Sequence, residues 1–222
     1  KVYELDTRDL EGVLDAARRE GISGICTAGT DVAVASVGYV CSRMGLPGIS
    51  EKAAGTVTDK WKMKQAFAAR HVSTAAFRQV YSLEEAYKDA EQMGYPVCLK
   101  AVDKSGSRGV QKAGDPGELK AAYEAAGKVT DKEYVLVEEY IQAHEIGVDG
   151  FVQNGRPVLI VPHDKEMYRA AAVSIPAGHR FPFSCGEELD REIRRQISLA
   201  VEAVGMDHCP FNADVFVRDG KV

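Results

Sequence analysis

The sequence lacks any apolar run that approaches the roughly 20 residues of a membrane-spanning helix, and its first residues do not form a signal peptide. It also lacks a block of positive charge, because 28 Lys and Arg residues are interspersed with 33 Asp and Glu residues and the net charge is −5. Such a surface does not favour a polyanion. We therefore expect a cytoplasmic protein that has neither a membrane nor a nucleic acid as its partner.

Cysteine is scarce and follows no pattern. The chain has 5 cysteines, an odd number, and none has the CxxC spacing of a metal site or a redox motif. Most lie inside apolar runs, so we interpret them as reduced residues of the core. They are Cys26, Cys41, Cys98, Cys185 and Cys209.

The P-loop signature is also missing, because no Gly-Lys-Ser/Thr follows a glycine-rich segment. A different pattern occurs at residues 95–110, where Lys100 ends an alternating β-rich run and a Ser/Gly loop begins at Ser105. Glycine lets backbone N–H groups approach a ligand, and a lysine adds positive charge against phosphate oxygens. The segment is therefore either a triphosphate clamp or an ordinary hairpin turn beside a solvated lysine.

The remaining patterns indicate a mixed α/β protein. With 222 residues, 45% of them hydrophobic and 27% charged, the chain can bury the core of one large or two small domains. Helical spacing and capping residues predict helices over residues 9–21, 31–45, 60–71, 82–94, 116–127 and 187–205. Alternation predicts strands over 22–27, 95–102, 110–113, 134–141, 145–153, 156–161 and 171–175, with an irregular run at 176–182.

The end of the sequence carries a turn signal. Asp219-Gly220 follows a predicted strand around Asp214, and almost no return strand stands behind it. Because a fold seldom ends on an unpaired strand edge, we expect the sequence to be a fragment of a longer chain.

Four features stand in one order along the chain. They are Thr58-Asp-Lys60 at the start of a helix, Lys100 before its Ser/Gly loop, Glu138-Glu-Tyr-Ile141 with Glu145 beyond it, and Asp214 in a late strand. In this order and spacing they resemble the ATP-grasp superfamily, and in particular its carboxylate–amine ligases. The Leu46-Pro-Gly and Gly94-Tyr-Pro-Val segments are similar to the carbamoyl phosphate synthetase, biotin carboxylase and amino-acid ligase branches.

The resemblance implies a fold and a division into domains. Residues 56–222 would form an ATP-grasp domain, an α+β fold within the α/β class. Its small, lid-bearing subdomain would lie at about 75–140 and its larger subdomain at 141–222. Residues 1–55 would be the latter part of a Rossmann-like domain that precedes it.

The resemblance also implies ATP and Mg²⁺ as cofactors. Lys60 and Lys100 would contact the α- and β-phosphates, Glu145 would accept the ribose hydroxyls, and Asp214 would be the first carboxylate ligand of Mg²⁺, with further Glu and Asn ligands beyond Val222. The residues that would bind ATP are Lys60, Lys100, Ser105, Gly106, Ser107, Gly109, Val110, Glu138, Glu139, Tyr140, Ile141, Glu145 and Phe216.

Some of these assignments leave alternatives open. The side chain that meets the adenine amino group is Glu138 or Glu139, while Phe216 would pack beneath the ring. Arg108 either joins Lys100 in catalysis at the γ-phosphate or is solvated. His179 and Arg180 lie where the superfamily places acceptor-substrate contacts. The other histidines share no metal-ligand spacing and are predicted to lie on the surface; they include His144, His163 and His208.

By resemblance, the protein is an ATP-dependent ligase that activates a small-molecule carboxylate as an acyl phosphate and joins it to an amine or another nucleophile. Such a protein can be a homodimer. Lysines, loop amides and carboxylate-held Mg²⁺ are the groups that neutralise and align a triphosphate. Two other interpretations are a nucleotide-binding regulatory or structural domain without turnover, and phosphoryl transfer without ligation.

Overall fold

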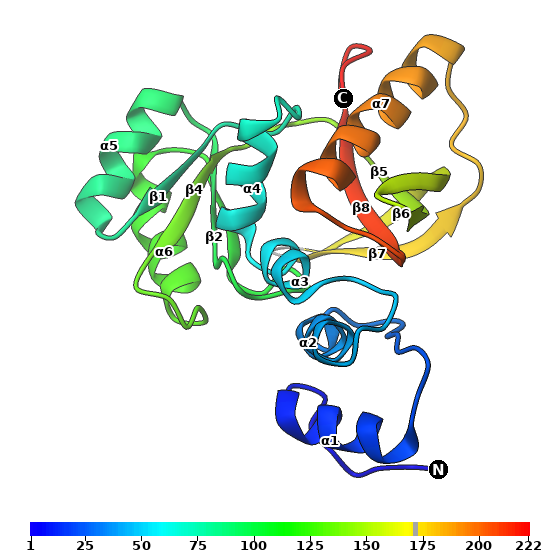
Figure 1. Cartoon of the computed structure of the whole chain (residues 1–222). Helices are drawn as coiled ribbons and strands as arrows, with labels where there is room; N and C mark the ends of the chain where they lie inside the picture. The colour runs from blue at the N-terminus through cyan, green and yellow to red at the C-terminus, as the bar shows by residue number, and fades with distance from the viewer. Residues whose placement is uncertain (171–172) are drawn as a thin grey trace.

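The computed structural model describes residues 1–170 and 173–222. Within them the chain forms seven helices and eight strands, and the strands make two four-stranded antiparallel sheets (Figure 1). This confirms the mixed α/β content that the sequence patterns predict. No helix in these two segments is long and apolar enough to cross a membrane.

Three helices begin the chain. They are α1 (Leu10–Glu20), α2 (Val34–Met44) and α3 (Glu51–Val57). The prediction of a strand at residues 22–27 is wrong: this segment is irregular, because no described strand lies beside it to complete a hydrogen-bond ladder. Ile25 packs against the cores of these helices instead. Helix α3 was not predicted from the sequence, although Ser50 caps it by accepting a hydrogen bond from the Ala53 N–H at 3.1 Å.

The first sheet, sheet A, has the strand order β1-β4-β2-β3. Its strands are β1 (Phe77–Val80), β2 (Val97–Lys100), β3 (Val110–Ala113) and β4 (Val135–Glu139). Two helices pack on one face through a buried apolar cluster that includes Val80, Leu99 and Val137; they are α5 (Leu83–Met93) and α6 (Pro116–Gly127). Because side chains alternate between the faces of a strand, Lys100 and Glu138 point to the opposite face, which we call the inner face of sheet A.

Helix α4 (Lys60–Ala69) lies against this inner face. The Trp61 ring meets the Phe77 ring of β1 edge-on at a centroid distance of 5.6 Å. The Lys60 N–H donates to the Val102 carbonyl oxygen at 2.9 Å, which ties the start of the helix to the end of β2. Asp59 caps the helix, as predicted, by accepting from the Lys62 N–H.

The second sheet, sheet B, has the order β7-β6-β5-β8. Its strands are β5 (His144–Gln153), β6 (Arg156–Ala170), β7 (Val173–Arg180) and β8 (Cys209–Val217). Helix α7 (Glu187–Val204) covers one face, where Ile193 and Ile197 pack with Ile146 and Val148 (Figure 1). The irregular run predicted at 176–182 is wrong up to Arg180, because this segment pairs with β6. Part of the strand predicted at 171–175 lies outside the described residues.

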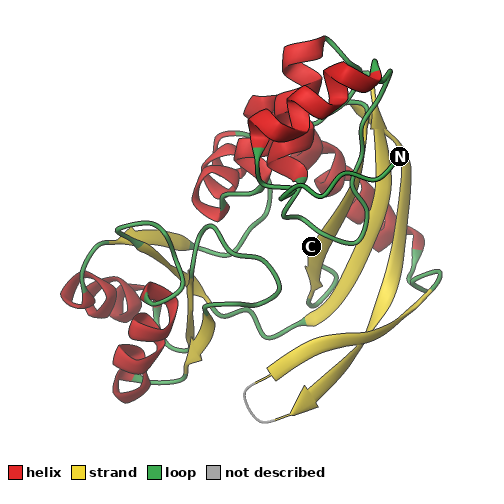
Figure 2. Cartoon of the chain, turned by 90° about the horizontal axis from the view of Figure 1, so that it is seen from below, coloured by secondary structure: helices red, strands yellow, loops and turns green. Residues whose placement is uncertain are grey.

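The two sheets form separate groups of strands, each with its own helices (Figure 2). Sheet A spans residues 77–139 and sheet B spans residues 144–217. These spans fall inside the ranges predicted for the two subdomains, whose exact boundaries stay a prediction.

The turn between β2 and β3 depends on two glycines. Gly106 and Gly109 have φ of +65° and +69°, which is the left-handed region that favours glycine. A Cβ on Gly109 would also lie 2.3 Å from Val129 Cγ2 and 2.8 Å from Ala101 Cβ, whereas nothing lies within 4 Å of a Cβ on Gly106.

We expect Gly109→Ala to destabilise the protein more than Gly106→Ala. Both substitutions force an L-residue into the left-handed region, at a cost of about 1 to 2 kcal/mol. Only Gly109→Ala also overpacks its surroundings, so its total should reach about 3 kcal/mol. Urea unfolding of the two variants measures the difference. If both variants lost the same free energy of unfolding, the close packing at Gly109 would be contradicted.

Candidate functional site

A buried carboxylate with two lysines lies on the inner face of sheet A. The Lys100 Nζ donates to Glu138 Oε2 at 2.6 Å, and the Lys64 Nζ lies 3.3 Å from the same oxygen. Lys64 also donates to Thr74 Oγ1 at 2.8 Å. Only 2% of Glu138 is exposed to solvent. Strand β4 and helix α4 thus bring a carboxylate and cations together away from water.

The second oxygen of this carboxylate is buried. Among the residues that the structure describes, none donates a hydrogen bond to Glu138 Oε1, although a buried carboxylate oxygen normally has a donor. Among the two glutamates considered for the adenine amino group, Glu138 therefore offers a free acceptor. The carboxylate of Glu139 is instead half-buried and accepts from the Ala76 N–H at 3.4 Å.

The environment shifts the pKa values of the three lysines in different directions. Burial lowers the pKa of Lys60, and the nearby Lys100 charge lowers it further. Burial likewise lowers the pKa of Lys64 despite the Glu138 carboxylate. Burial also acts to lower the pKa of Lys100, but the Glu138 carboxylate outweighs it, so this pKa is raised. The cluster therefore holds more positive charge than Glu138 alone neutralises.

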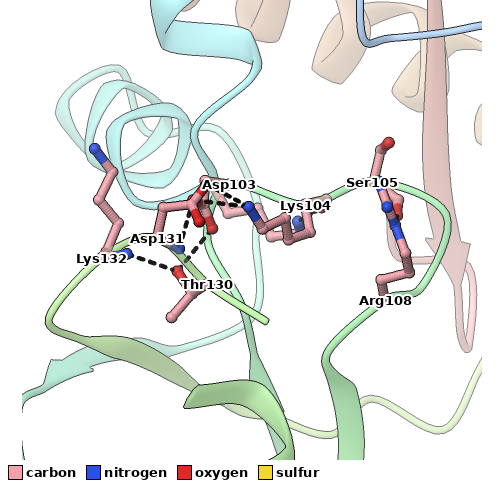
Figure 3. A network of polar contacts seen from close by, with 8 residues as sticks. Asp103, Lys104, Ser105, Arg108, Thr130, Asp131 and Lys132 are labelled. Carbon is pink, nitrogen blue, oxygen red and sulfur yellow. Dashed lines mark hydrogen bonds and ion pairs between the residues drawn. The ribbon is translucent and has the colours of Figure 1, made fainter. Parts of the chain in front are cut away.

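The Ser/Gly loop is anchored at its base. Asp103 accepts from Thr130 Oγ1 at 2.7 Å and from the Asp131 N–H at 2.9 Å, and Lys104 forms ion pairs with both carboxylates (Figure 3). The Lys104 carbonyl oxygen in turn accepts from Lys60 Nζ. The predicted phosphate-binding lysine and the predicted loop are thus in direct contact.

The exposed tip of the loop is closed on itself. Arg108 Nε donates to the Ser105 carbonyl oxygen at 3.2 Å, so the side chain of Arg108 folds back onto its own loop (Figure 3). Gly109 is held below the tip, where its carbonyl oxygen accepts from the Ala101 N–H at 2.8 Å. Ser107, like the glycines, has a positive φ, of 58°. The base is therefore fixed, and the tip at 105–108 presents its groups to solvent.

A second charged cluster lies on sheet B, on the face opposite α7, which we call the inner face of sheet B. Lys165 of β6 donates to Glu145 Oε1 of β5 at 2.8 Å and forms a shorter ion pair with the Asp214 carboxylate of β8. The Lys165 side chain is 5% exposed, whereas that of Asp214 is 64% exposed. Burial acts to lower the pKa of Lys165, but the two carboxylates outweigh it and raise the pKa.

The two inner faces look toward each other. The Asp214 carboxylate of sheet B contributes to the raised pKa of Lys100 in sheet A, so the two charged clusters lie within electrostatic reach. The structure therefore brings together four of the sequence-predicted residues, which are Lys60, Lys100, Glu138 and Asp214, with Glu145 beside Asp214.

The other predicted residues lie around these clusters. Strand β4 ends at Glu139, so Tyr140 and Ile141 belong to the connection to β5; the Tyr140 N–H donates to the Pro96 carbonyl oxygen at 3.2 Å. Phe216 is 41% exposed and shares the inner face of sheet B with Asp214, because they are two residues apart on β8. An exposed aromatic ring beside charged groups is available to a ligand.

The histidines differ from prediction. His163 is wrongly predicted to lie on the surface: it is fully buried, because the residue opposite it on β5 is Gly147 and leaves room for the ring. His144 is exposed, as predicted. His179 and Arg180 end strand β7 and are exposed, and Arg180 lies 3.6 Å from Asp164. The structure does not place these two residues against the lysine cluster of sheet A.

Sequence reasoning missed Lys64 and Lys165. Lys64 stands one helical turn after Lys60, so both lie on the same face of α4, and this spacing could have revealed it. Lys165 lies in β6, which continues past the predicted end at residue 161, and no sequence pattern singles it out. In the described part of the chain, no three His, Cys, Asp or Glu side chains are arranged to hold a metal ion by themselves.

Two α+β units, each with lysines and carboxylates paired on the inner face of its sheet, agree with the fold that the resemblance implies. Residues 93–222 match the ATP-grasp domain family. This is more than half of the chain, and the chain belongs to the ATP-grasp family.

Individual relatives agree with this family. The chain is 30% identical over 172 residues to a D-alanine–D-alanine ligase of Marinobacter nauticus, covering 77% of this chain and 52% of that protein. It is 26% identical over 181 residues to a carbamoyl phosphate synthase large chain of Pasteurella multocida, covering 79% of this chain and 16% of that protein. Among solved structures, phosphoribosylglycinamide synthetase from Anaerococcus prevotii matches with a TM-score of 0.80 at 26% identity, covering 100% of this chain and 55% of that one.

The chain spans about half the length of the D-alanine–D-alanine ligase. Curated relatives of this chain carry the names of ligases and of a synthase. Structures with the same fold include a D-alanine–D-alanine ligase from Bacillus anthracis complexed with ATP, at TM-score 0.72, 18% identity, 96% coverage of this chain and 70% of that chain.

The buried cluster makes a prediction for stability. We expect Glu138→Gln to cost about 3 kcal/mol near pH 7, because it leaves buried lysine charges without their counter-ion. Lys100 has a folded-state pKa above its unfolded value, so its stabilisation is complete below the unfolded pKa and is lost as the pH rises through the folded pKa. Without Glu138, burial lowers the pKa values of the lysines, so they lose their buried charge as the pH rises. The difference in free energy of unfolding between the wild type and Glu138→Gln should therefore narrow toward about pH 10.

Urea unfolding across pH 7 to 10 measures this deficit. Glu139→Gln is the matched control, because the neighbouring carboxylate is half-buried and forms no ion pair in the described structure. A Glu138→Gln deficit that stays constant with pH, or that Glu139→Gln reproduces, would contradict the charge explanation.

Proposed function

We propose that this chain is the nucleotide-binding part of a ligase that uses Mg²⁺ and ATP to activate a carboxylate as an acyl phosphate and joins it to an amine. The observation that carries this proposal is the facing pair of charged clusters. One holds Lys60, Lys64 and Lys100 around a single carboxylate, and the other presents Asp214 and Glu145. An excess of cations near the exposed carboxylate of Asp214 suits a polyphosphate with its metal ion.

The residues of sheet A fit a nucleoside triphosphate. The three lysines hold more charge than Glu138 balances. Within the described part of the chain, Glu138 Oε1 receives no hydrogen bond, and an adenine amino group would supply one. Lys60 and Lys100 would hold phosphates, and the loop amides at 105–110 would cover them. Backbone groups at 138–141 and the Phe216 ring would bind the base, and Glu145 the ribose.

The residues of sheet B fit a divalent cation together with a triphosphate rather than alone. Mg²⁺ in such sites typically takes one or two carboxylates and completes its coordination with phosphate oxygens and water. Asp214 provides an exposed carboxylate, while the described residues offer no complete set of ligands. When bound, the metal ion would neutralise the developing charge of the phosphates.

The residues of this chain would act mainly by positioning. Lys100 would draw negative charge from the phosphates, Arg108 would reach the γ-phosphate once the loop tip turns inward, and the faces of the sheets would exclude water. An oxygen of the substrate carboxylate would attack the γ-phosphorus, with ADP leaving. The amine would then attack the acyl carbon and release phosphate.

The substrates would be small molecules. Two kinds of relatives bear names that include alanine, namely D-alanine–D-alanine ligases and alanine–anticapsin ligases. D-alanine and L-alanine are therefore the first carboxylates and amines to test. We further propose a cytoplasmic protein, with the domain division at residues 55 and 140, which can act as a homodimer as resemblance implies.

The test is ADP release by the intact protein with Mg²⁺-ATP, D-alanine, L-alanine or bicarbonate, and hydroxylamine to trap an acyl phosphate. We expect carboxylate-dependent ADP and a hydroxamate. Lys100→Met should lower this rate about 10²-fold or more, because it removes charge stabilisation of the transferring group. Lys62→Met, an exposed lysine on helix α4, should leave the rate unchanged. ATP binding without ADP release from any carboxylate would favour a nucleotide-binding domain without turnover.

A second prediction concerns Lys165 as the resident counter-ion of Asp214. Because its ammonium is paired with Asp214, the carboxylate that would receive the metal ion, we expect Lys165→Met to tighten binding of free Mn²⁺ about tenfold. Electron paramagnetic resonance titration without nucleotide measures this affinity, and Lys62→Met is again the control. Unchanged or weaker Mn²⁺ binding would show that Lys165 does not compete with the metal ion for its carboxylate.

A further inference from the structure

A fully buried imidazole lies on the inner face of sheet B, beyond the residues proposed for the nucleotide. The ring of His163 lies over Gly147, its register partner on β5. A Cβ at position 147 would come within 2.1 Å of His163 Cε1, so only glycine leaves space for the ring. The ring of Phe181, the residue directly after β7, lies against the imidazole, with centroids 4.5 Å apart.

Both nitrogens of this ring face polar groups. His163 Nδ1 lies 3.1 Å from Nδ1 of His179, which is the end of the pair nearer to solvent. His163 Nε2 lies 3.3 Å from Asp149 Oδ2, close enough for an ion pair although not aligned as a hydrogen bond. The other oxygen of Asp149 accepts from Asn212 Nδ2 at 2.8 Å, which orients the carboxylate.

This arrangement selects one set of tautomers. The Asp149 carboxylate beside Nε2 favours a proton on that nitrogen of neutral His163. His163 Nδ1 then has a lone pair and accepts, so His179 Nδ1 must carry the proton that it donates. The Asp164 carbonyl, at 3.5 Å from His163 Nδ1, is too distant to compete strongly. Nε2 of His179 is consequently the ring nitrogen that carries the lone pair.

The position of His179 connects this pair to the proposed reaction site. His179 is the register partner of Lys165, and Lys165 contacts both Glu145 and Asp214. The exposed imidazole thus stands one strand away from the lysine that marks the carboxylate cluster.

We propose that His179 is the general base that accepts a proton through Nε2 from the ammonium group of the incoming nucleophile, with His163 and Asp149 as positioning residues that fix its tautomer. This inference rests on the proposed ligase function and names the residue that serves its second half-reaction. An amino group is protonated and unreactive near neutral pH, so a base must remove one proton before it can attack.

The step balances as follows. The R–NH₃⁺ group gives one proton to His179 Nε2 and becomes R–NH₂. Its lone pair forms the C–N bond at the acyl carbon, the C–O bond to phosphate breaks, and phosphate leaves with that electron pair. The second nitrogen proton leaves with the phosphate, and His179 returns its proton to solvent. Neither an oxidant nor a reductant is required.

The charged groups around the pair come from three strands of sheet B. On the inner face they are Asp149 and Glu145 on β5, Lys165 on β6 and Asp214 on β8, whereas Asp164 of β6 and Arg180 of β7 form their ion pair on the opposite face. The described residues of this region do not form a set of three metal ligands. A base fixed by its neighbours therefore accounts for the pair better than a metal centre does.

The first experiment reads the tautomers directly. Long-range ¹H–¹⁵N correlation spectra of the intact protein near pH 8 should show His179 protonated at Nδ1 and His163 protonated at Nε2. His163→Phe should remove the preference of His179 for this tautomer, whereas His208→Gln, on the far side of β5, should leave it unchanged. A wild-type His179 that carries its proton on Nε2 overturns the proposal, whatever the activity.

The second experiment separates this inference from the proposed function. His179→Gln should keep carboxylate-dependent hydroxamate formation, because hydroxylamine attacks as a neutral nucleophile, but should lose about 10²-fold in kcat for amide formation with D-alanine or L-alanine. This loss should shrink as the pH rises and the amine loses its proton. His163→Phe should show a smaller loss of the same pH dependence, and His208→Gln none.

The outcomes are distinct. If the wild-type protein forms no hydroxamate with any carboxylate tested, this counts against the proposed function. The tautomer measurement would still test the arrangement of His179, His163 and Asp149. Hydroxamate formation together with an unchanged amide rate in His179→Gln overturns the role of base. A loss in His179→Gln that is the same at every pH, or that also abolishes hydroxamate, would show a structural role and likewise overturns it.

Discussion

The placement of Glu138 is the constraint on which the rest of the site depends. A carboxylate that is 2% exposed is tolerated only with cations beside it, and Lys100 and Lys64 supply them from a strand and a helix on either side. This ion cluster fixes helix α4 on the inner face of sheet A and thereby sets the position of Lys60. Because Lys60 holds the Lys104 carbonyl, the base of the Ser/Gly loop follows from the same arrangement.

Local signals in the sequence predicted most of the elements. Capping residues and glycines placed helices α1, α5, α6 and α7, and alternation placed strands β2 and β3. The order of Lys60, Lys100, Glu138 and Asp214 was enough to predict the family. These predictions succeeded because each depends on neighbouring residues or on one-dimensional spacing.

Other features depend on contacts that spacing does not record. Residues 22–27 have β propensity but no partner strand, and residues 176–180 look irregular yet pair with β6. The ion pairs of Lys165 and the burial of His163 depend on residues of the neighbouring strands β5 and β8, which the local sequence around them does not reveal. Which of two adjacent glutamates is buried was likewise decided by the faces of β4, and the roles of the individual residues in binding stay predictions.

The fit between Gly147 and His163 has a consequence for how sequences of this kind can change. A methyl group at position 147 and an imidazole at position 163 exclude each other, so the two positions form an epistatic pair across β5 and β6. A lineage could gain the histidine only after the glycine was in place. Replacing the glycine later would leave no room for the buried imidazole. The two residues together therefore work as a sequence marker by which chains with a buried imidazole on this sheet can be sorted from those without one.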